Sequence, residues 1–93
     1  MGSFHATRQA LTGNVVAAIL PPHMVDAVEV GNAGVDDLYI YSTAADSVAH
    51  TNYITVPIGF ARSISLKSGR FKPDEAALYL MTPQNGTVVL IWL

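Results

Sequence analysis

Residues 78–93 read LYLMTPQNGTVVLIWL, and this stretch decides the fold class. Two short apolar runs, residues 78–81 and 87–93, flank the sequence Pro-Gln-Asn-Gly at residues 83–86. Asn-Gly between two apolar runs is typical of a type I′ turn, which needs a positive φ at both of its central positions. The stretch therefore predicts a β-hairpin.

Similar short runs precede this stretch along the chain. They cover residues 15–20, 25–30, 38–42, 53–56 and 63–66, and turn residues separate them. No segment keeps the apolar period of an amphipathic helix over three turns, and residues 43–52 are predicted to form a polar loop with one helical turn. Seven or eight short strands in 93 residues predict an all-β fold, a small antiparallel and jelly-roll-like β-sandwich. We assign residues 15–93 to this single domain and residues 1–14 to an N-terminal arm or an edge strand.

The composition excludes several classes of protein. The chain is 51% hydrophobic with a net charge of −2, which excludes intrinsic disorder. Its longest apolar runs are far shorter than the roughly 20 residues of a membrane span. Five scattered Lys and Arg residues give no basic surface for nucleic acid. There is no cysteine for disulfides or thiolate metal sites, and no secretion signal is recognisable, so we expect a soluble, unprocessed chain.

The run at residues 88–93 is apolar on both faces of its predicted strand. Val88, Leu90 and Trp92 alternate with Val89, Ile91 and Leu93. One face of each sheet in an antiparallel sandwich normally meets water, so this strand needs a second cover. That cover is either a segment of the same chain (residues 43–52 or the N-terminal segment) or another molecule. Only 13% of the residues are charged, against roughly 25% in typical proteins, and exposed apolar patches usually mark interaction sites.

We therefore favour a cover supplied by another molecule, and we predict interface residues on two strands. Leu90, Ile91, Trp92 and Leu93 are the first choices, for core and interface together. Tyr39 and Tyr41 are the second choices, because tyrosine is enriched at protein interfaces.

No catalytic, cofactor or metal site is predicted. His5, His23 and His50 have no metal-ligand spacing, and we expect the last two to be loop histidines exposed to solvent. Asp46, Ser47 and His50 are neighbours in sequence, but a catalytic triad needs an oriented base and an oxyanion hole. We expect Asp46 and Ser47 to form an Asx-type turn instead.

The remaining polar clusters have ordinary interpretations. The acidic pairs at residues 36–37 and 74–75 are predicted to be solvated turns, because adjacent strand residues point to opposite faces. Two interpretations stay open for a basic cluster, which either adds solubility or contacts an acidic partner. This cluster consists of Arg62, Lys67, Arg70 and Lys72.

The order of the short motifs carries a resemblance. They are VEVGN at 28–32, DLYIY at 37–41, YITVPIG at 53–59, RSI at 62–64, LYL at 78–80 and GTVV at 86–89. Over residues 11–93 the chain resembles small β-sandwich accessory proteins of tailed bacteriophage virions, of the capsid cement or decoration type. The resemblance implies a protein with no enzymatic activity and no cofactor. It implies binding to the major capsid protein on the outer surface of the head, as a dimer or trimer that bridges capsid subunits.

Three alternatives stay open beside this capsid role. A tail or head–tail connector adaptor belongs to the same broad class. A carbohydrate-binding β-sandwich would read glycans through Tyr39, Tyr41 and Tyr53. A small cupin-like enzyme would need a metal site assembled from distant strands.

Overall fold

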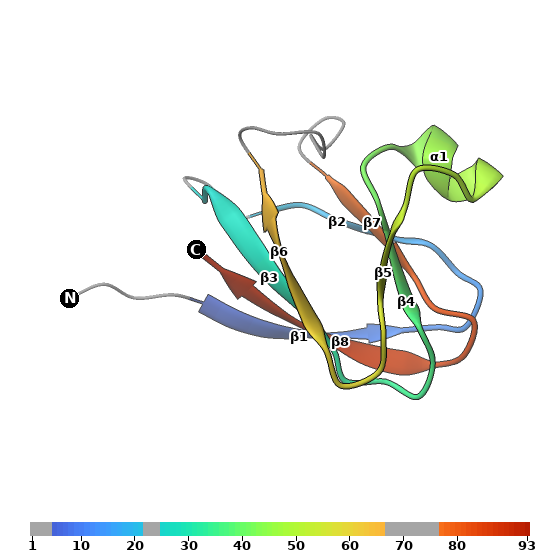
Figure 1. The fold of residues 1–93 in the computed structure, drawn as a ribbon, viewed down its shortest axis with the longest axis horizontal. Helices are drawn as coiled ribbons and strands as arrows, with labels where there is room; N and C mark the ends of the chain where they lie inside the picture. Colours follow the sequence, from blue (N-terminus) through green and yellow to red (C-terminus); the bar gives the residue numbers. More distant parts are fainter. Residues whose placement is uncertain (1–4, 22–24, 67–76) are drawn as a thin grey trace.

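The computed structural model describes residues 5–21, 25–66 and 77–93, and Figure 1 shows their arrangement. Their elements are β1 (His5–Leu11), β2 (Ala17–Ile19), β3 (Ala27–Asn32), β4 (Leu38–Tyr41), α1 (Ala44–Ala49), β5 (Ile54–Val56), β6 (Ala61–Ser65), β7 (Leu78–Met81) and β8 (Gly86–Trp92). The predicted short strands are therefore confirmed, and the helical turn lies inside the predicted loop. No helix among these residues is long and apolar enough to cross a membrane.

The strands form two antiparallel sheets of four strands. Their orders are β1-β8-β3-β6 and β2-β7-β4-β5, seen in the left and right parts of Figure 1. Among strands that follow each other along the chain, only β4 and β5 pair with each other, and every other connection crosses between the sheets. Eight strands in two sheets that exchange the chain in this way form a jelly roll, so the predicted fold class is confirmed.

The segment at residues 1–14 was predicted as an arm or an edge strand. Over His5–Leu11 it is the edge strand β1, which pairs with β8 along its whole length. Leu11 at the end of β1 is buried in the core.

The predicted hairpin is wrong, because β7 and β8 lie in different sheets. Neither Asn85 nor Gly86 has the positive φ that a type I′ turn requires. The β7–β8 connection is instead hydrogen-bonded to the β1–β2 connection. The Gly13 amide donates to Oδ1 of Asn85 (2.7 Å), and the Asn14 amide donates to the carbonyl of Thr82 (2.8 Å). Contacts with a distant segment thus override the local turn signal.

Alternation along the central strands β3, β4, β7 and β8 forms most of the core between the sheets. Its largest fully buried side chains are Leu38, Ile40, Leu78, Leu80, Leu90, Val28, Val30, Val56 and Val88. Burying one Val or Leu side chain contributes about 1.5–3 kcal/mol, so this set supplies the main stabilisation of a small domain.

One buried polar side chain, Asn32, joins the two sheets. Its Nδ2 group donates to the carbonyls of Asp36 (2.7 Å) and Val56 (2.8 Å), and its Oδ1 accepts from the Gly34 amide (2.9 Å). Its backbone amide donates to the carbonyl of Phe60, and its carbonyl accepts from the Gly59 amide. Because Asn32 bonds to both segments, it fixes the β3–β4 and β5–β6 connections at the same end of the sandwich. In Figure 1 that end lies at the lower right, and α1 lies at the top.

Candidate interaction surfaces

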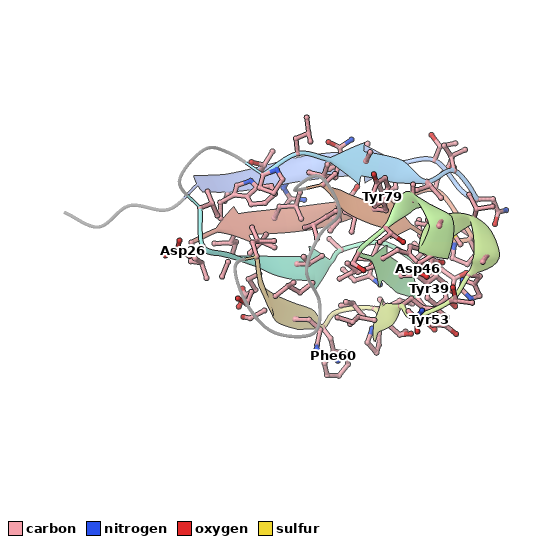
Figure 2. The ribbon with its side chains drawn as sticks, turned by 90° about the horizontal axis from the view of Figure 1, so that it is seen from above. Asp26, Tyr39, Asp46, Tyr53, Phe60 and Tyr79 are labelled. Atoms are coloured by element: carbon pink, nitrogen blue, oxygen red, sulfur yellow. The ribbon has the colours of Figure 1, made fainter. Side chains whose placement is uncertain are left out.

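A turn at residues 57–60, between β5 and β6, presents two large apolar side chains to solvent. The Phe60 amide donates to the carbonyl of Pro57 (3.1 Å), and Gly59 has a φ of 82°. A positive φ at the third residue is the signature of a type II turn and favours glycine there. We call these residues the apolar turn. Its side chains Ile58 and Phe60 are 52% and 66% exposed, and Figure 2 shows Phe60 projecting away from the sandwich.

The apolar turn is anchored rather than loose. Asn32 bonds to it on both sides, through the carbonyl of Phe60 and the amide of Gly59. Val35, on the neighbouring β3–β4 connection, is a further large apolar side chain with 64% exposure. In the sequence, residues 57–59 were noted only as part of the YITVPIG motif, and their exposure was not predicted. The sequence does contain a signal for this turn, because Gly59 has a large apolar residue on each side.

The outer side of β8 forms a second surface. Val88, Leu90 and Trp92 face the core, as the alternation predicts, while Val89 and Ile91 face outward and are half-buried. The neighbouring strands β1 and β3 flank β8 on both sides, which explains why these two side chains are not fully exposed.

The predicted interface residues fall into three groups. Leu90 and Trp92 are buried in the core, and Tyr41 is fully buried where α1 packs against β4, so their own chain covers them. Tyr39 and Ile91 are half-buried. Leu93 is 55% exposed. Only the last two groups present surface to another molecule, and their contact role stays a prediction.

The outer face of the other sheet gathers the tyrosines. The chain has four, and all lie on this face: Tyr39 and Tyr41 on β4, Tyr79 opposite Tyr41 on β7, and Tyr53 just before β5. The ring of His50 stacks on Tyr53, with centroids 4.3 Å apart, and Tyr39 meets both rings edge-on at 5.0 and 5.2 Å. We call Tyr39, Tyr41, His50 and Tyr53 the aromatic cluster. Figure 2 shows Tyr39 and Tyr53 side by side near α1.

His50 was predicted as a solvent-exposed loop histidine. It is exposed, but its Nδ1 also lies 2.5 Å from the hydroxyl of Tyr41, in hydrogen-bonding contact. Burial, followed by the neighbouring tyrosines, raises the pKa of Tyr41. Burial and then the charge of Asp37 raise the pKa of Tyr39. Both phenols therefore remain protonated and able to donate near neutral pH.

Asp46 holds the segment that presents His50. Its Oδ1 accepts from the hydroxyl of Thr51 (3.0 Å) and from Nδ2 of Asn52 (3.2 Å), and its amide donates to Oγ1 of Thr43, the N-cap of α1. The hydrogen bonds that its carboxylate accepts, that from Asn52 first, lower the pKa of Asp46. His50 and Asn52 both adopt left-handed backbone conformations, with φ of 56° and 51°.

The predicted Asx-type turn at Asp46 and Ser47 is therefore wrong, since both residues lie within α1. The hydroxyl of Ser47 donates to the carbonyl of Ala44 (2.6 Å), while Oδ1 of Asp46 accepts from Thr51 and Asn52. These residues are not arranged as a catalytic triad. The acidic pair at residues 36–37 has structural partners: Asp36 accepts from the Asp37 amide and from Nε2 of Gln84.

Among the described residues, no group of three or more His, Cys, Asp or Glu side chains is placed to hold a metal ion. Several residues considered in the sequence lie outside the described part: His23, Lys67, Arg70, Lys72 and the acidic pair at 74–75. The chain matches no protein-family model, no curated protein and no solved structure.

Proposed function

We propose that this chain is a structural binding protein of a large assembly, and specifically a capsid cement protein on the outer surface of a bacteriophage head. The observation that carries this proposal is the apolar turn. Ile58 and Phe60 are more than half exposed on a turn that backbone hydrogen bonds hold in one shape. Large apolar side chains presented rigidly bind well because little conformational freedom is lost on contact.

The capsid assignment draws on the motif order and on the low charge of the chain. A cement protein needs a compact body with contact surfaces on more than one side, because it must touch several capsid subunits. The apolar turn, the outer side of β8 and the aromatic cluster lie on different parts of the sandwich. Weak contacts suffice in such a setting, since a repeated lattice multiplies them.

The apolar turn can be tested directly by binding to virions. Purified full-length chain is mixed with virions, stripped of this protein, from the phage whose genome encodes it. We expect Phe60→Ala to weaken binding at least about tenfold, because removing an aromatic anchor commonly costs more than 1.4 kcal/mol. The matched control is Val48→Ala, which truncates an 88% exposed apolar side chain on α1.

The control variant should bind like the unmodified chain. Equal binding by Phe60→Ala and the unmodified chain would contradict the proposed role of the apolar turn. Binding confined to one vertex or to the tail would replace the cement role with that of a connector or tail adaptor.

The aromatic cluster favours a second candidate function, glycan binding. Tyr53 is 41% exposed, and its stacking on His50 holds the ring in a fixed orientation. Sugars present C–H faces that pack on such rings, and their hydroxyls need polar neighbours. We expect, if this function holds, that a glycan array gives a reproducible hit that is lost in Tyr53→Ala and kept in Tyr53→Phe. An array without hits would remove this candidate.

A further inference from the structure

The outer face of the β1-β8-β3-β6 sheet has an arrangement of charge that suits a second copy of the same chain. We call this surface the β8 face. Its two central rows run across the sheet, each from β1 through β8 and β3 to β6. Residue pairing gives them as Ala6, Ile91, Glu29 and Ser63 in one row, and Arg8, Val89, Gly31 and Ala61 in the other.

Most of these side chains are small, so the face is shallow. Val89 and Ile91 form its apolar midline along β8. The two rows contain two charged residues, Arg8 on β1 and Glu29 on β3. They lie on opposite sides of the β8 midline. Each is about 4.8 Å from the midline, the spacing between neighbouring strands. Among the described residues no ion pair joins them.

We propose that two copies of this chain pack through their β8 faces, related by a two-fold axis that runs nearly parallel to β8. Such an axis places the β1 side of one copy over the β3 side of the other. It does not shift residues along β8, so each row faces the same row of the second copy. Val89 and Ile91 then meet the same residues of the second copy. Arg8 lies over Gly31 of the partner subunit, where there is no side chain in its way.

Glu29 of the partner subunit is two residues before Gly31 on the same strand, in the next row. The long side chain of Arg8 can reach it from its place over Gly31 of the partner subunit. The two-fold symmetry also brings Glu29 of the first copy to Arg8 of the partner subunit. The dimer therefore contains two identical ion pairs. Two sheets that pack face to face are rotated by about 30°, which places the axis about 15° from β8. Sheets about 10 Å apart are close enough for an arginine to bridge them.

The size of the β8 face predicts a weak dimer. Four strands about 4.8 Å apart and six residues of about 3.3 Å each give an area of about 400 Å² per copy. The total of about 800 Å² is below the 1,200 Å² or more of stable complexes. We therefore expect dissociation at low concentration and dimers near millimolar concentration.

The dimer also has a consequence for attachment. Because the axis follows β8, both copies point in the same direction, and both apolar turns lie at one end of the pair. A dimer can then place two turns on one surface, which raises the effective affinity. Only this consequence rests on the proposed function, since self-association of the purified chain needs no capsid.

Sedimentation equilibrium of the full chain, from micromolar to about millimolar concentration, tests the proposal. We expect a monomer–dimer equilibrium that Arg8→Glu and Glu29→Arg each weaken at least tenfold, because each substitution opposes like charges across the axis. Mixing these two variants should restore association, since their charges complement one another. Arg62→Glu, an equal change of net charge on the exposed edge strand β6, serves as the control and should leave the equilibrium unchanged.

Three results would overturn the proposal. They are a monomer at every concentration, a control variant that dissociates as strongly as Arg8→Glu, and a mixture of the two variants that stays monomeric. Circular dichroism of each variant shows whether it is folded. The mixing experiment decides the outcome even if one substitution lowers stability, because recovery requires both chains to be folded.

Discussion

Asn32 holds together the β3–β4 and β5–β6 connections at one end of the sandwich. The residue is 6% exposed, and its side chain makes three hydrogen bonds to backbone groups, two in the β3–β4 connection and one at the end of β5. We expect Asn32→Leu to lower the free energy of unfolding by about 2–4 kcal/mol, because backbone groups lose their partners in a buried place.

Urea unfolding measures the loss at Asn32. Asn32→Asp should also destabilise the chain, since a carboxylate cannot donate to the carbonyls of Asp36 and Val56. Asn85→Ala, which removes a single exposed hydrogen bond, should cost less than about 1 kcal/mol. Equal stability of Asn32→Leu and the unmodified chain would show that these bonds are not needed.

Tyr41 makes the stability of the fold sensitive to alkali. Its pKa is raised by burial, so the native state holds the phenolic proton more tightly than the unfolded chain does. The protonated Tyr41 phenol therefore contributes fully to the stability of the fold below the ordinary pKa value of 10.0, and this contribution is lost as the pH rises above that value. Tyr41→Phe keeps the buried ring but loses the contact with His50, which should cost about 1 kcal/mol near neutral pH.

The unfolding free energy of the unmodified chain and of Tyr41→Phe, measured against pH, tests this assignment. We expect the alkaline loss to be smaller in the variant. Identical losses would assign alkaline unfolding to other groups.

Among the elements, the strands were predictable and their pairing was not. Alternation in residues 78–81 and 87–93 reflects burial of one face, which is a local property that a sequence records. Asn85-Gly86 is also a local signal, and it predicted a pairing that the structure lacks. Sheet membership depends on long-range contacts, such as those of Gly13 and Asn14 with the β7–β8 connection.

The same limit applies to the candidate surfaces. Tyr39 and Tyr41 were predictable as outward residues of a strand, because Leu38 and Ile40 take the core. His50 was not predictable as their neighbour, since its place depends on a left-handed backbone after a six-residue helix. Phe60 was missed because Gly59 indicates a turn but does not indicate whether the apolar side chains beside it are exposed.

Gly13 tests the contact between the β1–β2 and β7–β8 connections. A Cβ at this position would come within 2.8 Å of the carbonyl oxygen of Pro83 and 3.0 Å of the Cα of Gln84, both backbone atoms. We expect Gly13→Ala to lower the melting temperature measurably, because two backbone segments must separate. Gly31→Ala is the control for stability, since its nearest neighbour would be at 3.7 Å. A Gly13→Ala variant as stable as the Gly31→Ala variant would contradict this contact.

The helix α1 and the segment that follows it depend on an ionised Asp46. Hydrogen bonds lower its pKa, so its contribution to the fold is present above the ordinary value of 3.8 and is lost as the pH falls through the lower, native value. We expect the tyrosine signal in near-ultraviolet circular dichroism to change in acid, as His50 and Tyr53 separate. Asp46→Asn should show a weaker signal already at neutral pH and a smaller change in acid. An acid-induced change of equal size in both proteins would show that Asp46 does not hold the aromatic cluster.

The three surfaces of the molecule face different ways. The β8 face and the aromatic cluster lie on the outer sides of opposite sheets, and the apolar turn lies at one end between them. A dimer formed through the β8 face therefore leaves the apolar turn and the aromatic cluster free. The proposed dimer contact and the proposed contact with a capsid therefore do not block each other.

The proposed cement role is best tested by the location and copy number of this chain on virions. Cryo-electron microscopy of virions from the encoding phage, with quantitative mass spectrometry, gives both. We predict density distributed over the head in a fixed ratio to the major capsid protein, with the turn at residues 57–60 against the shell. The cement role would be contradicted if the chain is absent from the virion. The role of the turn would be contradicted if the opposite side of the molecule lies against the shell.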